Sequence, residues 1–296
     1  MAADGPPIEL IVVDNHSEDF PEEEVRRIWP GARIAALSEN VGFGPAVNHA
    51  AAHAKGEILL LVNPDARAMG DPFSPIARAF AEHPDWVAVA PRLVGTADAG
   101  DAGASPRETT EEESQEEFQL RKLPTLGQAF RELMLLDRAF PRSRARWRSR
   151  YLDRDRGQAF EVEQPAAAAL AIRTPAFSAL RGFDPRFVPA WWEDVDLCAR
   201  LATLGKIVYY PESVFAHGGG ASMKRLGYDR FLPVYYRNAV AYWSKHHGTL
   251  GTLLFRSLVA AGMVLRVLAL PFRRRDPRPK RESFRAYRGA FRAAFS

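Results

Sequence analysis

An α/β fold built on a mostly parallel, doubly wound sheet is predicted by two features of the sequence. Between residues 8 and 62, short apolar runs of strand length alternate with segments that have helical spacing. The run Ile58–Val62 is apolar throughout, as in a strand covered on both faces, and it stops at a turn carrying Asp65. Ligands of such sheets bind at the carboxyl ends of the strands, where Asp14 and Asp65 would both lie.

The first 94 residues supply most of the predicted elements. Apolar residues recur at helical spacing in residues 20–29, and Pro45 suits the first turn of a second helix after the glycine turn 40–44. Asp65 has two interpretations of equal weight, because Asn63 and Asp65 can simply shape the turn around Pro64. We predict strands at residues 8–13, 34–37, 58–62 and 87–94, and helices at 20–29, 45–54 and 73–82.

The remainder of the chain is less regular. Residues 95–117 combine small residues with glutamates, which indicates a solvated, flexible acidic insertion. The helix predicted from residue 191 to 205 has three acids in its first turn, and the helix dipole alone can explain them. It does not explain the neighbouring Trp191 and Trp192. We further predict helices at 126–140 and 250–270, an exposed loop or helix at 142–156, and strands at 162–172, 207–210 and 214–217.

Composition restricts the class of protein. Apolar residues make up 47% and charged residues 26%, as in ordinary globular proteins. The single cysteine, Cys198, excludes an intrachain disulfide and a cysteine-based zinc site. The start lacks the pattern of a secretion signal, and we find no window of about 18 residues free of charge, which argues against a membrane-spanning helix. We expect a cytoplasmic protein.

The formal net charge of +4 is unevenly distributed. From residue 273 onward, nine Arg or Lys face only Asp276 and Glu282, so the basicity is expected in the tail. The apolar and basic segment 248–296 suits the surface of an anionic membrane, and a helix packed on the core with a solvated tail is an equal alternative. Nucleic-acid binding is not expected, because no recognisable module joins the arginines.

Four polar points of the chain invite a common explanation: Asp14, Asp65, the acids near residue 194, and His217. A hard divalent cation on a diphosphate takes one or two carboxylates and leaves room for phosphate oxygens, and histidine completes such a site for manganese. A separate carboxylate can serve as a general base. A shared site and a scatter of unrelated caps and turns are equally compatible with the sequence.

Several ordered motifs carry a resemblance to a known family. They are Val12-Val13-Asp14-Asn15, Asn40-Val41-Gly42-Phe43-Gly44 with Asn48, Asn63-Pro64-Asp65, and Gly182-Phe183-Asp184 leading into Glu193-Asp194-Val195-Asp196. Together, over residues 8–247, the chain resembles the family 2 inverting glycosyltransferases, and most of all their rhamnosyltransferase-like branch. There, Asn-Pro-Asp takes the place of an Asp-x-Asp motif.

The resemblance implies a fold of the nucleotide-diphospho-sugar transferase (GT-A) type over residues 1–247, with 248–296 as a helical extension. It implies a dTDP- or UDP-sugar donor, Mg²⁺ or Mn²⁺ as cofactor, and a glycan or lipid-linked glycan as acceptor. Asp194 would be the catalytic base and Glu193 its helper. The other implied roles are donor binding by Asp14, Asn15, Asn40, Gly42, Asn48 and Asp65, metal binding by Asp65 and His217, and acceptor contact by Trp191, Trp192 and Asp196.

Three departures from the family pattern accompany this resemblance. The strand and helix that normally open the fold are not recognisable before residue 8, Asn63 lacks the charge of the first Asp in Asp-x-Asp, and Ala167 replaces a frequent glycine near the acceptor region. The first departure supports an alternative function, a catalytically silent binding protein on the same fold.

Overall fold

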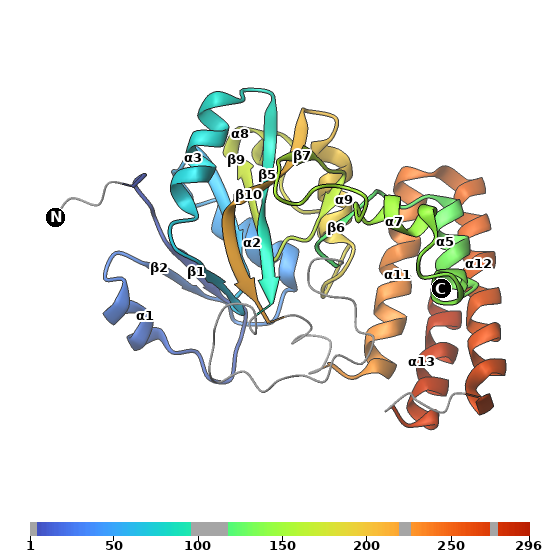
Figure 1. The fold of residues 1–296 in the computed structure, drawn as a ribbon. Coiled ribbons are helices and arrows are strands. Elements are labelled where there is room, and N and C mark those ends of the chain that lie inside the picture. The colour runs from blue at the N-terminus through green and yellow to red at the C-terminus, as the bar shows by residue number, and fades with distance from the viewer. Residues whose placement is uncertain (1–4, 96–117, 219–225, 273–277) are drawn as a thin grey trace. The chain divides into compact units, whose positions relative to one another are not determined.

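The computed structural model describes residues 5–95, 118–218, 226–272 and 278–296 (Figure 1). The chain forms two compact units. Unit 1 comprises residues 1–122, 154–189 and 193–219, and unit 2 comprises 123–153, 190–192 and 220–296. This division differs from the expected boundary after residue 247, because segments 123–153 and 220–247 cluster with the C-terminal helices.

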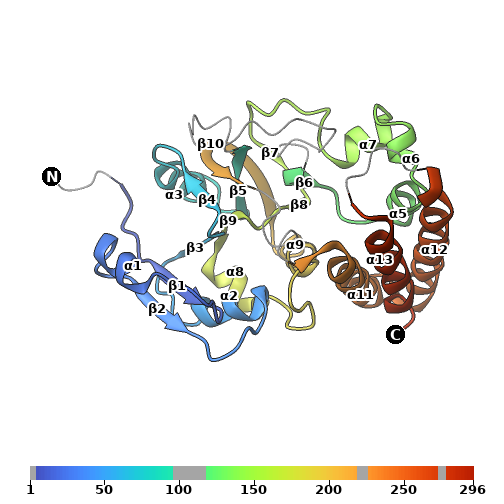
Figure 2. The same ribbon diagram turned by 90° about the horizontal axis from the view of Figure 1, so that it is seen from below.

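Unit 1 begins with a small parallel sheet. Strands β1 (Ile11–Asp14) and β2 (Arg33–Ala36) pair in parallel, with Asp14 opposite Ala36 at their carboxyl ends. Helix α1 (Glu22–Ile28) makes the crossover between them, and α2 (Phe43–Ala51) follows β2 (Figure 2). Both helices start two residues from their predicted first residues, so Pro45 lies in the first turn of α2 as expected.

The main sheet of unit 1 has the strand order β3-β9-β5-β10-β4, and a short β7 (Phe160–Glu161) pairs with β10. Its strands are β3 (Ile58–Val62), β4 (Ala66–Ala68), β5 (Trp86–Gly95), β9 (Ala169–Arg173) and β10 (Lys206–His217). Only β5 and β10 pair in parallel among these described strands, so the sheet is mixed and the prediction of a mostly parallel sheet is corrected. The reason is that β9 inserts antiparallel between β3 and β5, and its apolar sequence carries no signal of direction.

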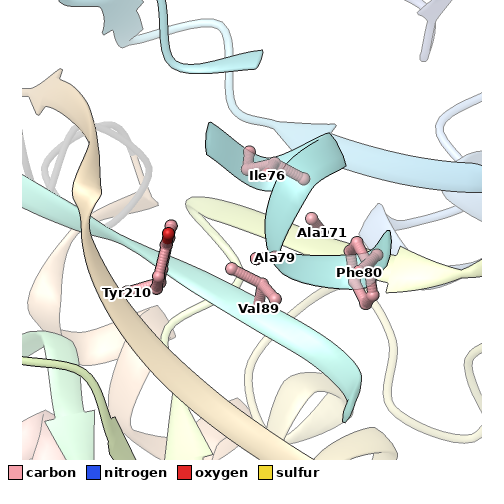
Figure 3. Packing of buried hydrophobic residues seen from close by; sticks show 6 residues of the cluster. All are labelled: Ile76, Ala79, Phe80, Val89, Ala171 and Tyr210. Carbon is pink, nitrogen blue, oxygen red and sulfur yellow. The ribbon is translucent and has the colours of Figure 1, made fainter. Parts of the chain in front are cut away.

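Helix α3 (Phe73–Glu82) covers one face of the main sheet. Its Ile76, Ala79 and Phe80 pack against Val89 and Tyr210, with Ala171 in the same buried cluster (Figure 3). Small alanines on the helix and on β9 permit this close packing. The expected pair of strands 207–210 and 214–217 is one strand, β10, whose register against β5 shifts between Tyr210 and Val214.

Several predicted elements are shorter or broken. The strand expected at 162–172 contains only β8 (Gln164–Pro165) and β9, and β8 pairs with β6 (Leu120–Arg121) in a ribbon. The helix expected at 126–140 divides into α5 (Leu126–Leu133) and α6 (Leu136–Ala139), because Leu135 has a φ of 61°. Also described are α7 (Arg144–Ser149), α8 (Thr174–Ala179) and α9 (Glu193–Leu201).

Three long helices form most of unit 2 and run side by side (Figure 1). They are α11 (Tyr228–His246), α12 (Gly248–Ala269) and α13 (Lys280–Ala293), and a 3₁₀ turn, η1 (Leu270–Phe272), extends α12. A Cβ on Gly262 would meet Leu133 at 3.0 Å, so glycine permits α12 to approach α5 closely. The acidic insertion falls almost entirely in 96–117, outside the described residues.

Two expectations about the C-terminal part change. The segment Gly248–Phe272 is long and apolar enough to cross a membrane, with an 18-residue window that reaches a mean hydropathy of 2.0, so the expectation of no such segment is corrected. Arg256 and Arg266 interrupt this segment, but the mean hydropathy of that window is still high enough for a membrane-spanning helix. The basic charge also extends beyond the tail: unit 2 holds 23 Lys or Arg and 6 Asp or Glu, a formal charge of +17, whereas unit 1 carries −13.

Candidate functional site

Asp65 and His217 lie together at one end of the main sheet in unit 1. The Oδ1 atom of Asp65 is 3.2 Å from Nε2 of His217. Strand pairing causes this meeting, since His217 is opposite Ala66 in the β10–β4 ladder and the amide of Gly218 donates to the carbonyl of Asp65 at 3.2 Å. Two residues 152 positions apart in sequence are thereby fixed as neighbours.

The chemistry of this pair fits a divalent metal. A carboxylate and an imidazole are both ligands that Mn²⁺ accepts, and two protein ligands leave coordination positions for phosphate oxygens. The side chain of Asp65 is 34% exposed and that of His217 12%, so a ligand can reach the pair from solvent. Within the described residues no third histidine, cysteine or acid completes a metal cluster, which makes phosphate oxygens or water necessary partners.

Glu193 and Asp194 open helix α9 in unit 1. Glu193 is 7% exposed, and its Oε2 has no hydrogen-bond partner in the described part of the chain. Burial, together with the adjacent Asp194 carboxylate, holds the pKa of Glu193 well above its usual range. Burial also raises the pKa of Asp194, but backbone hydrogen bonds, among them those from the amides of Val195 and Ala167, and the charge of Arg121 oppose that rise.

The surroundings of Asp194 include residues that the sequence did not single out. Its Oδ1 accepts a hydrogen bond from the amide of Val195 at 2.8 Å, and its Oδ2 accepts one from Nε2 of Gln164 at 3.4 Å. Gln164 and Arg121 are opposite each other in the β6–β8 ribbon. The position of Gln164 beside Asp194 depends on the pairing of β8 with β6, which is distant in sequence, and no sequence pattern indicated it.

Two consecutive residues connect the Asp194 region to the turn after β3. The backbone amide of Ala167 donates to Asp194. The carbonyl of the next residue, Ala168, accepts a hydrogen bond from the amide of Asn63 at 2.9 Å. The Asn63–Asp65 turn and the buried carboxylate of α9 are thus attached to the same short stretch of backbone. Ala167 itself is 7% exposed.

Asn15, Asn40 and Gly42 form one hydrogen-bonded loop. The side-chain amide of Asn15 donates to Oδ1 of Asn40 at 3.1 Å and to the carbonyl of Gly42 at 3.2 Å, while its Oδ1 accepts from the amide of Val41 at 2.9 Å. Gly42 has a φ of 90°, and a Cβ there would lie 2.8 Å from the carbonyl oxygen of Pro189. These predicted donor residues therefore shape the loop before α2, and their polar atoms are largely engaged within it.

Asn48 joins α2 to the turn that precedes α9. Its side chain donates to the carbonyl of Phe183 and accepts from the amide of Phe183, both at 2.8 Å. Gly182 has a φ of 69°, and a Cβ there would lie 2.2 Å from Oδ1 of Asn48, so glycine is required beside this contact. Both ends of the Asn48 amide are used in this contact, and its predicted role in donor binding stays a prediction.

Asp14 and Asp196 differ in accessibility. Asp14 lies at the carboxyl end of β1, half-buried, and its Oδ1 accepts from the amide of Ser17 at 2.9 Å. Asp196 is fully buried and forms an ion pair with Arg200 at 2.8 Å. The predicted acceptor contact by Asp196 is therefore corrected to an internal role in α9. Burial likewise raises the pKa of the Cys198 thiol well above its usual range, in agreement with a buried, inert cysteine.

Trp191 and Trp192 belong to unit 2 and have an unusual backbone. Their φ angles are 73° and 77°, in a region that bulky residues rarely adopt. Asn238 of α11, 1% exposed, donates from its side-chain amide to the carbonyls of Ala190 at 3.0 Å and Trp191 at 3.1 Å. Trp192 also packs against Tyr235, with ring centroids 5.5 Å apart. The sequence did not indicate a role for Asn238, because it is a single amide in a helix with many aromatic residues.

Comparison with known proteins found a family model that matches part of the chain. Residues 1–139 match the model of glycosyl transferase family 2. The match covers β1, the Asn40–Gly44 loop and the turn with Asp65, which are three of the motifs on which the resemblance rested. The motif from Gly182 to Asp196 lies outside the matched residues. A search of curated protein sequences found no match.

Solved structures with a similar fold include several glycosyltransferases. GalNAc-T7 with UDP, GalNAc and Mn²⁺ has a TM-score of 0.51 at 14% identity, over 81% of this chain and 43% of that one. TarS of S. aureus with UDP has a TM-score of 0.46 at 15% identity, over 90% and 63%. A mannosyltransferase of Pyrobaculum calidifontis with GDP-Man and Mn²⁺ has 0.47 at 16%, over 97% and 76%. The fold is of the GT-A type, and the chain spans less than two thirds of the first two glycosyltransferases.

Proposed function

We propose that the protein is a metal-dependent, inverting glycosyltransferase that moves a sugar from a nucleotide-diphosphate donor to a glycan or lipid-linked glycan acceptor. Rhamnose on dTDP is the candidate donor sugar, from the resemblance of the Asn63-Pro64-Asp65 motif, with UDP as the other candidate nucleotide. The observation that carries the proposal is the shared backbone of Ala167 and Ala168, which connects the Asn63–Asp65 turn to Asp194.

In this proposal, the donor is held by its diphosphate near Asp65 and His217 and by its base near Asp14. A bound Mg²⁺ or Mn²⁺ would offset the charge of the departing diphosphate. GalNAc-T7, which shares the fold, was solved with UDP and Mn²⁺. Asn15, Asn40 and Asn48 act indirectly, by fixing the loop before α2 and its connection to the turn before α9.

Asp194 is the proposed general base. Its ionised carboxylate accepts the proton of an acceptor hydroxyl while the hydroxyl oxygen bonds to the anomeric carbon of the sugar. The bond from that carbon to the diphosphate oxygen breaks on the opposite face, so the configuration inverts. Glu193, whose pKa is raised by burial and by the adjacent Asp194 carboxylate, is the proposed helper of Asp194.

The test uses two substitutions with separate readouts. Asp194→Asn should lower transfer by roughly 10²–10⁴-fold while calorimetry with Mn²⁺ and the nucleotide-sugar still detects binding. Asp65→Ala should instead weaken the metal-dependent binding. Asp85→Asn, which removes an exposed carboxylate paired with Lys206, is the matched control and should behave as the unmodified protein. Full transfer by both site variants would refute the assignment, and absence of binding heat with every donor would favour the silent binding protein.

A further inference from the structure

Helix α12 presents an uncharged face to solvent. Its exposed positions recur every three or four residues and therefore lie along one side of the helix. Leu250 is 71% and Leu268 66% exposed, and Phe272 on η1 is 83% exposed. The positions on this face, called here the leucine face, are Leu250, Leu253, Leu254, Ser257, Ala261, Val264, Leu268 and Phe272.

The opposite side of α12 packs against the other helices of unit 2. Phe255, Val259 and Met263 are buried, and Nη1 of Arg266 donates to the carbonyl of Leu133 at 2.6 Å. A helix crossing a bilayer alone would have to give up these contacts. The leucine face is therefore suited to lie along an apolar boundary while the rest of the helix remains packed.

Helix α13 exposes a second face of different composition. Between residues 281 and 295, which cover most of α13 and the two residues after it, every exposed side chain is an arginine or a phenylalanine. These are Arg281, Phe284, Arg285, Arg288, Phe291, Arg292 and Phe295. This set is called here the arginine–phenylalanine face. Ser283, Ala286, Tyr287 and Ala290 are buried on the other side. Cationic and aromatic side chains on one helix side are typical of helices that lie in the headgroup region of a membrane.

A pocket joins η1, at the end of α12, to the arginine–phenylalanine face. It is lined by Leu270 of η1 and by Lys280, Arg281, Phe284, Arg285 and Arg288. Four cationic side chains beside two apolar ones match a phosphate group that is attached to hydrocarbon. The formal charge of +17 on unit 2 adds a long-range attraction to any anionic surface.

We propose that unit 2 docks on an anionic phospholipid bilayer, with a lipid phosphate in this pocket, the arginine–phenylalanine face at the headgroups and the leucine face against the acyl boundary. This gives a residue-level basis for placing the enzyme peripherally at the cytoplasmic face of a membrane, close to a lipid-linked acceptor. The docking itself does not depend on the proposed transfer reaction.

Two other occupants fit the observations less well. A second copy of the chain would bring the arginines of α13 against those of its partner in a two-fold contact, and like charges repel. A nucleic acid would neutralise the arginines but would leave the eight-position leucine face without a partner. A phospholipid surface supplies both the anionic and the apolar component.

The first experiment measures flotation of the full chain with vesicles of phosphatidylcholine alone or mixed with phosphatidylglycerol. Binding is expected only with the anionic lipid and should weaken as salt is added. The double substitution Arg281→Gln and Arg285→Gln should lower the affinity by roughly 25-fold, because each basic residue at such a surface contributes about a fivefold factor. The matched control, Arg26→Gln with Arg27→Gln on α1, removes the same charge from unit 1 and should leave the affinity unchanged.

The second experiment examines the leucine face. Leu250→Gln with Leu268→Gln should weaken vesicle binding by at least about tenfold while the salt dependence persists, because these leucines lose burial at the acyl boundary and no charge is altered. Thermal melting verifies that each variant is folded. Equal binding to neutral and anionic vesicles, or equal loss in the α1 control, would overturn the proposal.

Three further outcomes separate the alternatives. A dimer that dissociates on substitution of Leu250 and Leu268, measured by light scattering, would identify a second copy as the occupant and overturn the proposal. Tighter binding to duplex DNA than to anionic vesicles would overturn it as well. Transfer to a soluble acceptor without any vesicle binding would refute the docking and leave the glycosyltransferase proposal standing.

Discussion

Glu193 and Asp194 are adjacent acids whose carboxyl groups have different surroundings. Glu193 is buried with an oxygen that lacks a partner among the described residues, whereas Asp194 receives amide hydrogen bonds and the field of Arg121. Burial therefore raises the pKa of both acids, and at Asp194 the amide hydrogen bonds and the charge of Arg121 oppose that rise. Buried acids with shifted pKa values are frequent in acid–base sites.

The pH dependence of transfer should report on Asp194. Because burial raises its pKa, the fall in kcat/KM on the acidic side should occur at higher pH than for an ordinary carboxyl group of about 3.9. Replacing Arg121 with Gln removes a cation that lowers this pKa, so the acidic limb should move to still higher pH. A limb that stays in place in the Arg121 variant would contradict the assignment of Asp194 as the titrating base.

Stability should depend on Glu193 in the opposite sense from a paired carboxylate. Its pKa is raised in the folded state, so the folded protein binds the proton more tightly, and stability is lost as pH rises from about 4.5 through the folded pKa. Glu193→Gln should remove this loss of unfolding free energy, which amounts to about 1.4 kcal/mol for each pH unit between the unfolded and the folded pKa of Glu193. Urea unfolding across pH measures it, and an equally steep loss in the variant would refute it.

Asn238 illustrates how an element positions residues without any recognisable motif. Helix α11 holds the left-handed backbone of Trp191 and Trp192 through two hydrogen bonds from one buried amide. Each such conformation costs of order 1–3 kcal/mol and persists only when its surroundings enforce it. These hydrogen bonds therefore fix the backbone of Ala190 and Trp191 within unit 2.

Substitution of Asn238 should therefore affect the predicted acceptor contact by Trp191 and Trp192. Asn238→Ala should destabilise the protein by about 1–3 kcal/mol and lower kcat/KM. Asn238→Asp should be no better than alanine, because a carboxylate cannot donate to the two carbonyls. Tryptophan fluorescence and acceptor KM provide readouts of the local change, and recovery of activity in the Asp variant would show that donation is unimportant.

The elements were predictable from sequence to different degrees. Helix α3 and strand β3 agree residue for residue with the prediction, because an apolar run and a helical repeat of sufficient length define both. The direction of β9, the break at Leu135 and the β6–β8 ribbon depend on contacts between distant segments, which no local pattern records. The proximity of Asp65 and His217 was predicted from a family resemblance, whereas Gln164, Arg121 and Asn238 were not predicted at all.

Charge is strongly divided over the whole molecule. A net charge of +4 conceals a unit of −13 and a unit of +17. From the sequence we placed the basicity in the tail, because residues 123–153, which carry seven arginines, lie far from the tail along the chain. Only the folded structure assigns them to the same unit.

This division predicts that chromatographic behaviour departs from the net charge. The protein should bind a cation exchanger at neutral pH more tightly than a protein of evenly spread charge +4, because unit 2 presents a local excess. Replacing Arg281 and Arg285 with Gln should lower the eluting salt concentration more than replacing Arg26 and Arg27, although the net charge is then identical. Equal shifts for the two variants would indicate that net charge alone determines retention.

The division into two units also determines how the protein can be dissected. The chain passes from one unit to the other at residues 122, 153, 189, 192 and 219, so neither unit corresponds to a continuous stretch of sequence. No single truncation yields unit 1 alone, and a fragment ending at residue 247 would keep α11 while removing α12 and α13, which pack on it in unit 2. Transfer of unit 1 to another protein would therefore require exchange of several segments at once.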